Sequence, residues 1–297
     1  NFSFGGHSYI KDRGYAFERQ LDLNSEGVLW KPIKHYKEHE KRADIPMMIL
    51  SPTVVNDGRK LYISAQPISY MCSSSLQSKM ALNNQRLKGI EFMRFFQEQN
   101  ADSLSFLSAL RMSATFPYIT PTVTLPSFPE MEIMDAGLTD NFGFTDAIRF
   151  LHVFKDWIAE NTSGVVIVSI RDSKKELEIE KSTKQGIFQK LFVPVGSLYT
   201  SWDYFQDINN DNLVDYARTW FKNDLQVVDF QYIPKPKYWD DEKMKHLDLA
   251  EIERLQKMER ASLSWHLTIR EKESLKRTIF ESNNLASMKK LNMLLEE

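Results

Sequence analysis

Apolar residues gather in short runs with turn residues between them, a pattern that predicts several β-strands. Two of these runs, residues 46–55 and 60–65, flank the sequence Asn56-Asp57-Gly58, whose residues tolerate the backbone angles of a tight reversal. We therefore expect the two runs to form a hairpin. Single strands are expected at residues 131–134, 165–170 and 225–233. The run at 165–170 lacks polar alternation, which favours a buried, parallel and central strand.

Elsewhere, apolar residues recur three and four positions apart, as they do on one face of a helix. The expected helices cover residues 87–97, 104–112 (opened by Ser103), 145–160 (capped by Thr145) and much of 186–224, followed by two or three amphipathic helices within 247–295 with caps at Asp248 and Thr268. The strand at 131–134, the helix after it and the strand at 165–170 predict a β-α-β unit. The fold class expected from this order is α/β.

Composition, charge and the length of the apolar runs limit the classes of protein to which this chain can belong. The chain has 297 residues, of which 42% are hydrophobic, enough to bury a sizeable core. Its net charge of −2 gives no reason to expect a nucleic-acid partner. Cys72 is the single cysteine, so no disulfide can form within the chain. No apolar run approaches the roughly 20 residues that span a bilayer, so we expect a cytoplasmic protein or one bound peripherally to a membrane.

The residues around Asp135 carry the main chemical hypothesis. Ser113, Ala114 and Pro117 precede Asp135, and Gly137 and Asn141 follow it. This order predicts a helix end, a proline-rich crossing, and a strand that delivers a carboxylate at its carboxyl end just before a turn. In α/β sheets, ligands and catalytic groups gather at the carboxyl ends of strands. An aspartate before a glycine turn is also a common cap residue, so the flanking residues decide between the two interpretations.

Those flanking residues resemble the motifs of the patatin-like phospholipases, above all the larger bacterial members. That family has a helix ending in small residues and Ala-x-x-Pro, then a strand ending in Asp-Gly-Gly or Asp-Gly-Ala, with an asparagine a few residues on. The resemblance covers residues 1 to about 172 well and the rest loosely, where 264–272 is similar to the tails of those larger members. It implies a patatin-like three-layer α/β sandwich, here incomplete at its start, with a carboxyl-terminal helical extension.

The resemblance also implies a mechanism, a lipid acyl hydrolysis by a serine–aspartate dyad without cofactor or metal. A serine attacks the acyl carbonyl, and water then hydrolyses the acyl-enzyme. By this resemblance Asp135 accepts the serine proton, while Ser113, Pro117, Gly137 and Asn141 shape the site. The implied partners are a lipid or ester substrate and a membrane surface.

The nucleophile of that family is missing from these residues. The family's serine sits in Gly-x-Ser-x-Gly at a strand-to-helix turn, and none of the 11 glycines belongs to such a sequence. Ser8 comes nearest, two residues after Gly6, but Ile10 stands where the closing glycine belongs. We therefore expect the chain to be inactive alone, with the serine on an upstream segment. The alternative is a catalytically dead scaffold that binds lipid or a partner. In either case an open sheet edge is expected to pair with the missing segment or a second copy.

Three further patterns have competing interpretations. His35 to His39 matches the zinc-peptidase pattern His-x-x-Glu-His, but residues 31–42 are charged on every side, so a solvated segment is expected. Cys72 lies among serines, which favours a loop or a helix start over a nucleophile. Aromatic residues that could line an acyl pocket, lie on a membrane or, as helical spacing favours, pack in the core are Phe192, Tyr199, Trp202, Tyr204, Phe205, Tyr216, Trp220 and Phe221.

The domain organisation expected from these patterns has two parts. Residues 1–172 form the later part of the catalytic domain, and residues 173–297 complete the sheet and add a mainly helical extension. Lys289 and Lys290 lie beside Leu291 near the end of this extension, so its last helix is a candidate for contact with a membrane, although Glu296 and Glu297 disfavour a strong anchor.

Overall fold

A computed structural model describes residues 2–4, 7–9, 11–73, 87–115, 120–173, 175, 187–235, 246–248, 251–252, 254–255, 259–261 and 267–296. The fold is mixed α/β, as expected, and divides into two compact units, Asn1–Val153 and Phe154–Glu297. The division falls inside one helix, α6 (Phe144–Asn161), whereas the sequence patterns place a boundary near residue 172.

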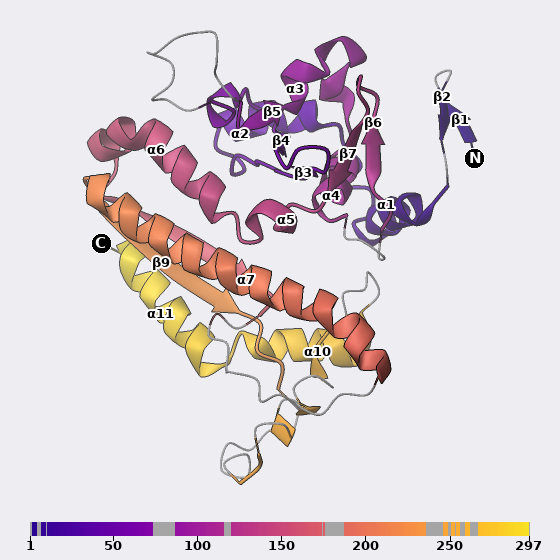
Figure 1. The fold of residues 1–297 in the computed structure, drawn as a ribbon. Coiled ribbons are helices and arrows are strands. Elements are labelled where there is room, and N and C mark those ends of the chain that lie inside the picture. Colours follow the sequence, from indigo (N-terminus) through magenta and orange to yellow (C-terminus); the bar gives the residue numbers. More distant parts are fainter. Residues whose placement is uncertain are drawn as a thin grey trace. The chain divides into compact units, whose positions relative to one another are not determined.

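A five-stranded mixed sheet forms the centre of the first unit (Figure 1). Its order is β5-β4-β3-β7-β6, and the strands are β3 (Thr53–Val54), β4 (Lys60–Tyr62), β5 (Gly89–Glu91), β6 (Val123–Leu125) and β7 (Met131–Met134). Strands β4 and β5 are parallel, and the other neighbours are antiparallel. The expected hairpin is confirmed, because Thr53 pairs with Lys60 and a bridge from Leu50 to Ile63 extends the pairing.

Short helices surround this sheet. They are α1 (Arg13–Asn24), α2 (Lys37–Lys41), α3 (Phe92–Phe95), α4 (Phe106–Ser113), α5 (Gly137–Asp140) and the 3-10 turns η1 (Ile33–Tyr36), η2 (Ser69–Met71), η3 (Gln97–Gln99) and η4 (Ala101–Ser103). A separate hairpin joins β1 (Phe2–Phe4) to β2 (His7–Tyr9). The core between sheet and helices is made of apolar side chains that include Val54, Leu61, Ile63, Ala109, Met112 and Ile133.

Helix α1 is held against α4 by one arginine. The guanidinium of Arg111 lies 3.4 Å from Asp12 and 3.4 Å from Glu18, on either side of Gly14. A Cβ at Gly14 would come within 2.1 Å of the Arg111 guanidinium carbon, so a larger residue would displace the guanidinium from this position. The contact fixes the carboxyl-terminal half of α4, which leads directly into Ser113.

The second unit is built on two parallel strands, β8 (Gly164–Arg171) and β9 (Asp224–Gln231), joined through the long helix α7 (Ile187–Trp220). Arg171 of β8 forms a bidentate ion pair with Asp207 of α7, in which its two terminal nitrogens lie 2.8 and 2.6 Å from the carboxylate oxygens. Helices α10 (Ile269–Thr278) and α11 (Ser282–Glu296) follow. The capping box expected at Thr268 is present, with Glu271 as its partner.

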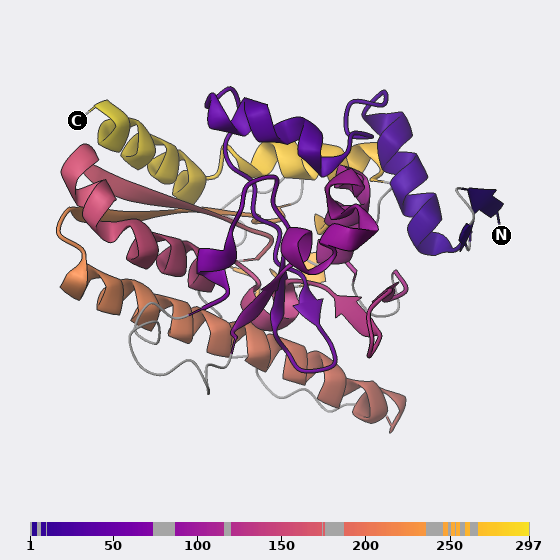
Figure 2. The same ribbon diagram turned by 90° about the horizontal axis from the view of Figure 1, so that it is seen from above.

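Side chains of α11 occupy the backbone groups at one edge of β9. Asn284 accepts a hydrogen bond from the Gln231 N–H and donates one to the Gln231 carbonyl, both at 2.9 Å. One turn on, Ser287 donates to the Asp229 carbonyl, and Lys290 donates to the Val227 carbonyl. Residues at this spacing share a helix face, so α11 serves here in place of a neighbouring strand. Figures 1 and 2 show α11 in yellow beside the orange β9.

Several expected elements are corrected by the structure. Residues 89–91 of the expected helix 87–97 form β5, because a run buried on both sides satisfies a strand as well as a helix. The expected β-α-β unit is also wrong: β7 belongs to the five-stranded sheet, and β8 pairs with β9 among the described strands. Strand β8 is parallel as expected but not buried throughout, since Val168 and Ile170 are exposed.

Two expected helix starts shift as well. The hydroxyl of Ser105, rather than that of Ser103, caps α4, and α6 begins at Phe144, so Thr145 lies inside it.

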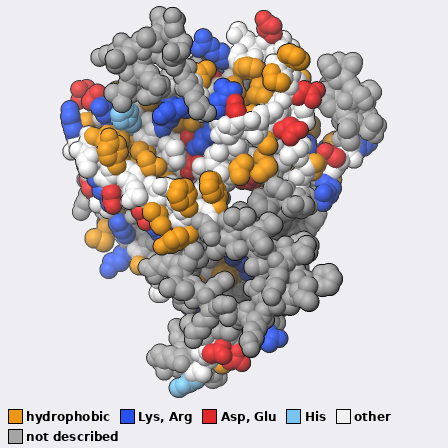
Figure 3. All heavy atoms as spheres, viewed as in Figure 1, with side chains coloured by type: hydrophobic (Ala, Val, Ile, Leu, Met, Phe, Trp, Pro, Cys, Tyr) orange, Lys and Arg blue, Asp and Glu red, His pale blue; other side chains and the backbone are white. Residues whose placement is uncertain are grey.

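The described helices include none that combines the length and the apolar character needed to cross a bilayer. Acidic and basic side chains are interspersed on the face of the described residues shown in Figure 3.

Candidate active site

Asp135 stands where β7 ends and α5 is about to begin. Its backbone N–H donates to the Thr115 carbonyl at 3.0 Å, and the next N–H, that of Ala136, donates to the Ser113 carbonyl at 3.2 Å. These two bonds join the end of α4 to the end of β7. The structure therefore brings together Ser113 and Asp135, which the sequence singles out 22 residues apart. Pro117, the other expected site residue, lies outside the described residues.

The carboxylate of Asp135 is held by its own turn. Its Oδ1 accepts a hydrogen bond of 2.6 Å from the backbone N–H of Gly137. The side chain is half-buried, and burial raises the pKa of Asp135 above its usual value, while the Gly137 hydrogen bond opposes this by stabilising the charged form. The result is a fixed carboxylate with an increased affinity for a proton.

Gly137 leaves room for two polar side chains. A Cβ at this position would lie 2.7 Å from Asn141 Oδ1 and 2.9 Å from Asp135 Oδ1, and both distances are closer than real side chains approach. A side chain at position 137 would therefore have to displace one of these two oxygens, and the constraint comes from this packing and not from an unusual backbone angle. Asp135, Gly137 and Asn141, which the sequence predicts as one group, do form one turn.

Thr53 of the β3–β4 hairpin forms hydrogen bonds with the residues of this turn. Thr53 is fully buried, and its hydroxyl donates to the Asp135 carbonyl at 3.0 Å. The same hydroxyl lies 3.1 Å from the hydroxyl of Thr139 in α5. Thr53 is also paired in the sheet with Met134, the residue before Asp135. A residue more than 80 positions away in the chain therefore fixes the backbone of the candidate base.

A buried cluster of charged side chains links β4 to α5 and α6. Lys60 Nζ lies 2.8 Å from Asp140 at the end of α5 and 2.8 Å from Asp146 in α6. The Tyr62 hydroxyl donates to Asp146 at 2.8 Å, and burial, followed by the Asp146 charge, raises the pKa of Tyr62. Sequence reasoning missed this cluster, because Lys60 and Tyr62 looked like ordinary polar positions of a hairpin strand.

The hydroxyl of Ser113 is buried and has no hydrogen-bond partner in the described part of the chain. The contribution that the structure shows for Ser113 is its backbone carbonyl, which receives the Ala136 N–H. Ser8, the other serine considered, is the middle residue of β2 and pairs with Ser3 of β1. It therefore lies within a hairpin strand and not at a strand-to-helix turn.

The two histidines of the His-x-x-Glu-His pattern lie on different short helices. His35 belongs to η1 and His39 to α2, with ring centroids 5.5 Å apart. His39 Nδ1 is 3.1 Å from Asp44, and the Arg42 guanidinium contacts the same carboxylate at 2.8 Å. The segment is not solvated on every side as expected, because Ile33 and Glu40 are buried.

Cys72 is buried and ends the short η2 helix, where it forms the cap at the end and not at the start. Burial, and next the Glu91 charge, raises the pKa of the Cys72 thiol to about 11. At neutral pH the sulfur is therefore protonated, and a thiol reacts far more slowly than a thiolate. This favours packing over nucleophilic chemistry, as the sequence predicted.

Most of the described aromatic side chains of α7 do not lie in the core that their spacing suggested, and the side chains of Phe192 and Tyr199 lie outside the described residues. Four of the described ones, Trp202, Tyr204, Phe205 and Tyr216, are exposed, and only Phe221, just after the helix, is deeply buried. The rings of Trp202 and Phe205 stack on one another at 5.8 Å. The period of 3.6 residues found the helix correctly but did not identify which face is covered.

No protein-family model matches this sequence, and no curated protein matches it either.

Proposed function

We propose that this chain carries the general base of a patatin-like lipid acyl hydrolase, and that Asp135 is that base. The observation that carries the proposal is the Asp135 turn. A half-buried carboxylate at the end of a strand receives the Gly137 N–H at 2.6 Å, in a turn where any larger residue at position 137 would displace the carboxylate or the Asn141 amide. A carboxylate held in this way is positioned for proton transfer.

The reaction needs two groups, of which this chain supplies one. The oxygen of a serine attacks the acyl carbonyl carbon, and the serine proton passes to the Asp135 carboxylate. Collapse of the tetrahedral intermediate breaks the ester bond, and the departing alcohol takes the proton from Asp135. Water then attacks the acyl-enzyme, giving up a proton to Asp135, which returns it to the serine oxygen as the acid leaves.

The electrostatics of Asp135 suit this role. A higher proton affinity makes the carboxylate a stronger base, provided that it is still ionised at the working pH. Because Asp135 must be ionised to accept a proton, activity falls as the pH drops through its pKa, which burial places above the usual aspartate value.

The choice of a lipid ester as substrate rests on the resemblance of residues 113–141 to the patatin-like family and not on geometry. The same holds for the nucleophile, which would come from a Gly-x-Ser-x-Gly segment that these 297 residues do not contain. The cytoplasmic or membrane-peripheral location is proposed because no apolar run of the sequence approaches the roughly 20 residues that span a bilayer.

The test is ester hydrolysis by the protein as isolated from its cells, with its intact mass measured alongside. We expect a mass above 34.7 kDa and hydrolysis of p-nitrophenyl decanoate. Asp135→Asn should lower the rate by about 10²- to 10⁴-fold, the usual contribution of a general base. Asp44→Asn makes the same change at a partly exposed carboxylate and should leave the rate unchanged.

Two results would overturn the proposal. One is equal activity in the Asp135→Asn and Asp44→Asn proteins. The other is a natural protein of 34.7 kDa without hydrolase activity, which would favour the rival function, a scaffold that binds lipid or a protein partner.

A further inference from the structure

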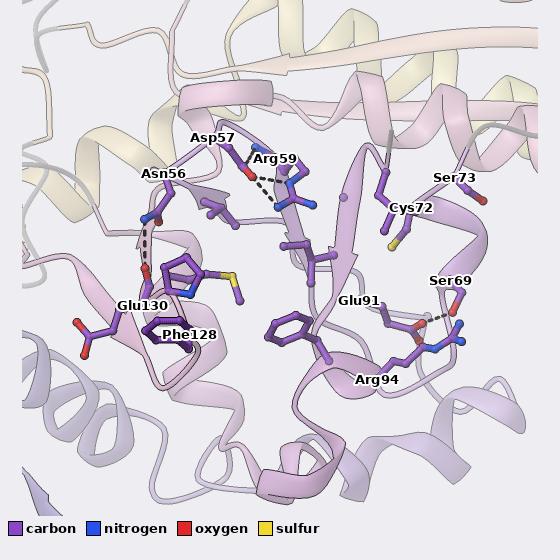
Figure 4. A pocket seen from close by; sticks show the side chains of 17 residues that line it. Asn56, Asp57, Arg59, Ser69, Cys72, Ser73, Glu91, Arg94, Phe128 and Glu130 are labelled. Atoms are coloured by element: carbon purple, nitrogen blue, oxygen red, sulfur yellow. Dashed lines mark hydrogen bonds and ion pairs between the residues drawn. The ribbon is translucent and has the colours of Figure 1, made fainter. Parts of the chain in front are cut away.

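A large cavity lies against the five-stranded sheet, and Asp135 is not among its lining residues. Its volume is about 880 Å³, and it is bounded by the β3–β4 turn, β5 and the loop before β7 (Figure 4). Among its lining residues are three large apolar side chains that are exposed to solvent: Leu87 by 48%, Phe95 by 52% and Phe128 by 102%. Exposed apolar side chains that converge on one cavity are typical of a binding site.

A second cavity, of about 680 Å³, adjoins the first and is lined by more cationic side chains. The two share Ser69, Glu91 and Arg94 as lining residues. Charged side chains lining the second cavity in the described part of the chain are three cations and two carboxylates: Lys34, Lys37, Arg94, Glu91 and Asp102. The excess of one positive charge belongs to the second cavity alone, because the first cavity adds Arg59 together with the carboxylates of Asp57 and Glu130. A ligand with one negative charge would therefore place that charge in the second cavity.

Both carboxylates of the second cavity already have partners. Glu91 is buried, and its two oxygens accept hydrogen bonds from the Ile68 N–H and the Ser69 hydroxyl. Asp102 lies 3.6 Å from Lys34.

Two cationic side chains that line the second cavity have no partner within the described residues. The side chains of Lys37 and Arg94 form no hydrogen bond or ion pair within the described residues. Lys37 is half-buried, so an unpaired charge there costs solvation free energy that a bound anion would offset. Figure 4 shows Arg94 and Phe128 on opposite sides of the first cavity, with Arg94 next to Glu91 and Ser69.

We propose that the two cavities together bind a long-chain carboxylate, with the acyl chain against Phe95 and Phe128 and the carboxylate between Arg94 and Lys37. Both volumes lie within the range of about 300–1,000 Å³ that is usual for small-molecule sites. The other cation of the first cavity, Arg59, is already paired with Asp57 at 2.6 Å. Arg94, which lines both cavities, is therefore the anchor for the head group.

This site is separate from the Asp135 turn. Met131 lines the apolar cavity at the start of β7, and Asp135 follows the last residue of the strand. Four residues of extended chain span about 13 Å. The proposal does not depend on catalysis, and binding here should persist when Asp135 is changed.

The test is calorimetric titration of the full chain with dodecanoate below its micelle concentration. We expect saturable binding that Arg94→Gln weakens at least tenfold and that Lys37→Gln weakens by a smaller factor. Phe128→Ser, at a fully exposed residue whose change should not affect folding, should also weaken it severalfold. Arg42→Gln removes a charge outside both cavities and should bind like the original protein. Octanoate should bind at least tenfold more weakly than dodecanoate, because four fewer methylene groups are buried.

Further comparisons separate this site from its rivals. Dodecanol should bind more weakly than dodecanoate and show no difference between the Arg94→Gln and original proteins. The proposal is overturned if Arg94→Gln and Arg42→Gln bind dodecanoate equally, or if no saturable binding is found. It is also overturned if Asp135→Asn abolishes binding while Arg94→Gln preserves it, since the acid would then occupy the Asp135 site. Undiminished binding by Asp135→Asn supports this site, even if the hydrolase proposal fails.

Discussion

The Asp135 turn and the His35–His39 segment both carry a residue pattern associated with hydrolases, but the fold supports them very differently. Asp135 is half-buried. Its backbone N–H donates to the Thr115 carbonyl, and it accepts hydrogen bonds from the Thr53 hydroxyl and the Gly137 N–H. His39 is 41% exposed, and its partner Asp44 is 47% exposed and only five residues away. The Asp135 turn is bonded to residues far away in the chain. The segment around the histidines is packed too, through the buried Ile33 and a hydrogen bond from Gln66 to the Lys37 carbonyl, but the side-chain partner of His39 is a local one.

The difference shows what a short motif needs before it indicates chemistry. A base must be held in one position and partly removed from water, and neither property is encoded by the motif residues alone. At Asp135 the motif residue Gly137 holds the carboxylate, while Thr53 of β3 and the residues at the end of α4 hold the backbone of the turn. Each prediction below either removes this support or tests whether the histidine segment lacks it.

The largest effect is expected from the buried cation beneath the Asp135 turn. Lys60→Met leaves Asp140 and Asp146 buried without their common partner, so the free energy of unfolding should fall by about 3–5 kcal/mol. Arg42→Met breaks an exposed pair beside the histidines and should cost about 0–1 kcal/mol. Urea denaturation of both variants measures the two values, and equal losses would contradict the contrast.

A smaller loss, confined to activity, is expected at Gly137. In Gly137→Ala the new methyl group must displace the Asp135 carboxylate or the Asn141 amide, and hydrolysis should fall about 100-fold, as for other misplaced catalytic groups. Gly143→Ala is the matched control: its φ of 73° makes alanine strained by about 1 kcal/mol, but its Cβ meets no atom within 4 Å. This variant should lose stability and keep its activity. Loss of activity in both would show that α5 and not the carboxylate had been disturbed.

Replacing Asp135, the proposed base, should stabilise the protein at neutral pH. The pKa of Asp135 is raised above the unfolded value of 3.8, so the native state binds this proton more tightly than the unfolded state does. That contribution is fully present below pH 3.8 and is lost as the pH rises through the native pKa, above which the ionised carboxylate costs stability. Asp135→Asn should therefore raise the Tm at pH 7, and Asp44→Asn should not. A lower Tm for Asp135→Asn at pH 7 would contradict the burial account.

The smallest effect is expected at the histidines. His35→Ala and His39→Ala should change the free energy of unfolding by no more than about 0.5 kcal/mol, as is usual at surface positions, and should leave hydrolysis unchanged. Thermal unfolding and the ester assay measure both quantities. Loss of activity in either variant would show that the segment takes part in catalysis after all.

Sequence patterns predicted the elements whose signals are local. Strand β7 lies at Met131–Met134 as expected, and the Thr268 capping box requires only residues three apart. Strand β5 was missed because Ile90, Phe92, Met93 and Phe96 fit a helical period as well as a short strand followed by a turn.

Long-range contacts were not predictable from single patterns. Nothing in the sequence shows that Lys60 meets Asp140, 80 positions away, or that Asn284 bonds to the edge of β9. The candidate site was predicted as far as its own turn reaches, in Asp135, Gly137 and Asn141. Its support from Thr53 and Lys60 came only with the fold.

The most direct test of Asp135 as the base is covalent labelling of the natural protein with a fluorophosphonate, which reacts with activated serines. We expect one serine to be labelled, in a Gly-x-Ser-x-Gly sequence outside these 297 residues, and we expect labelling to slow at least 100-fold in Asp135→Asn but not in Asp44→Asn. Peptide mass spectrometry locates the label. A labelled serine within these residues, or equal labelling of the two variants, would contradict the assignment of Asp135 as the general base.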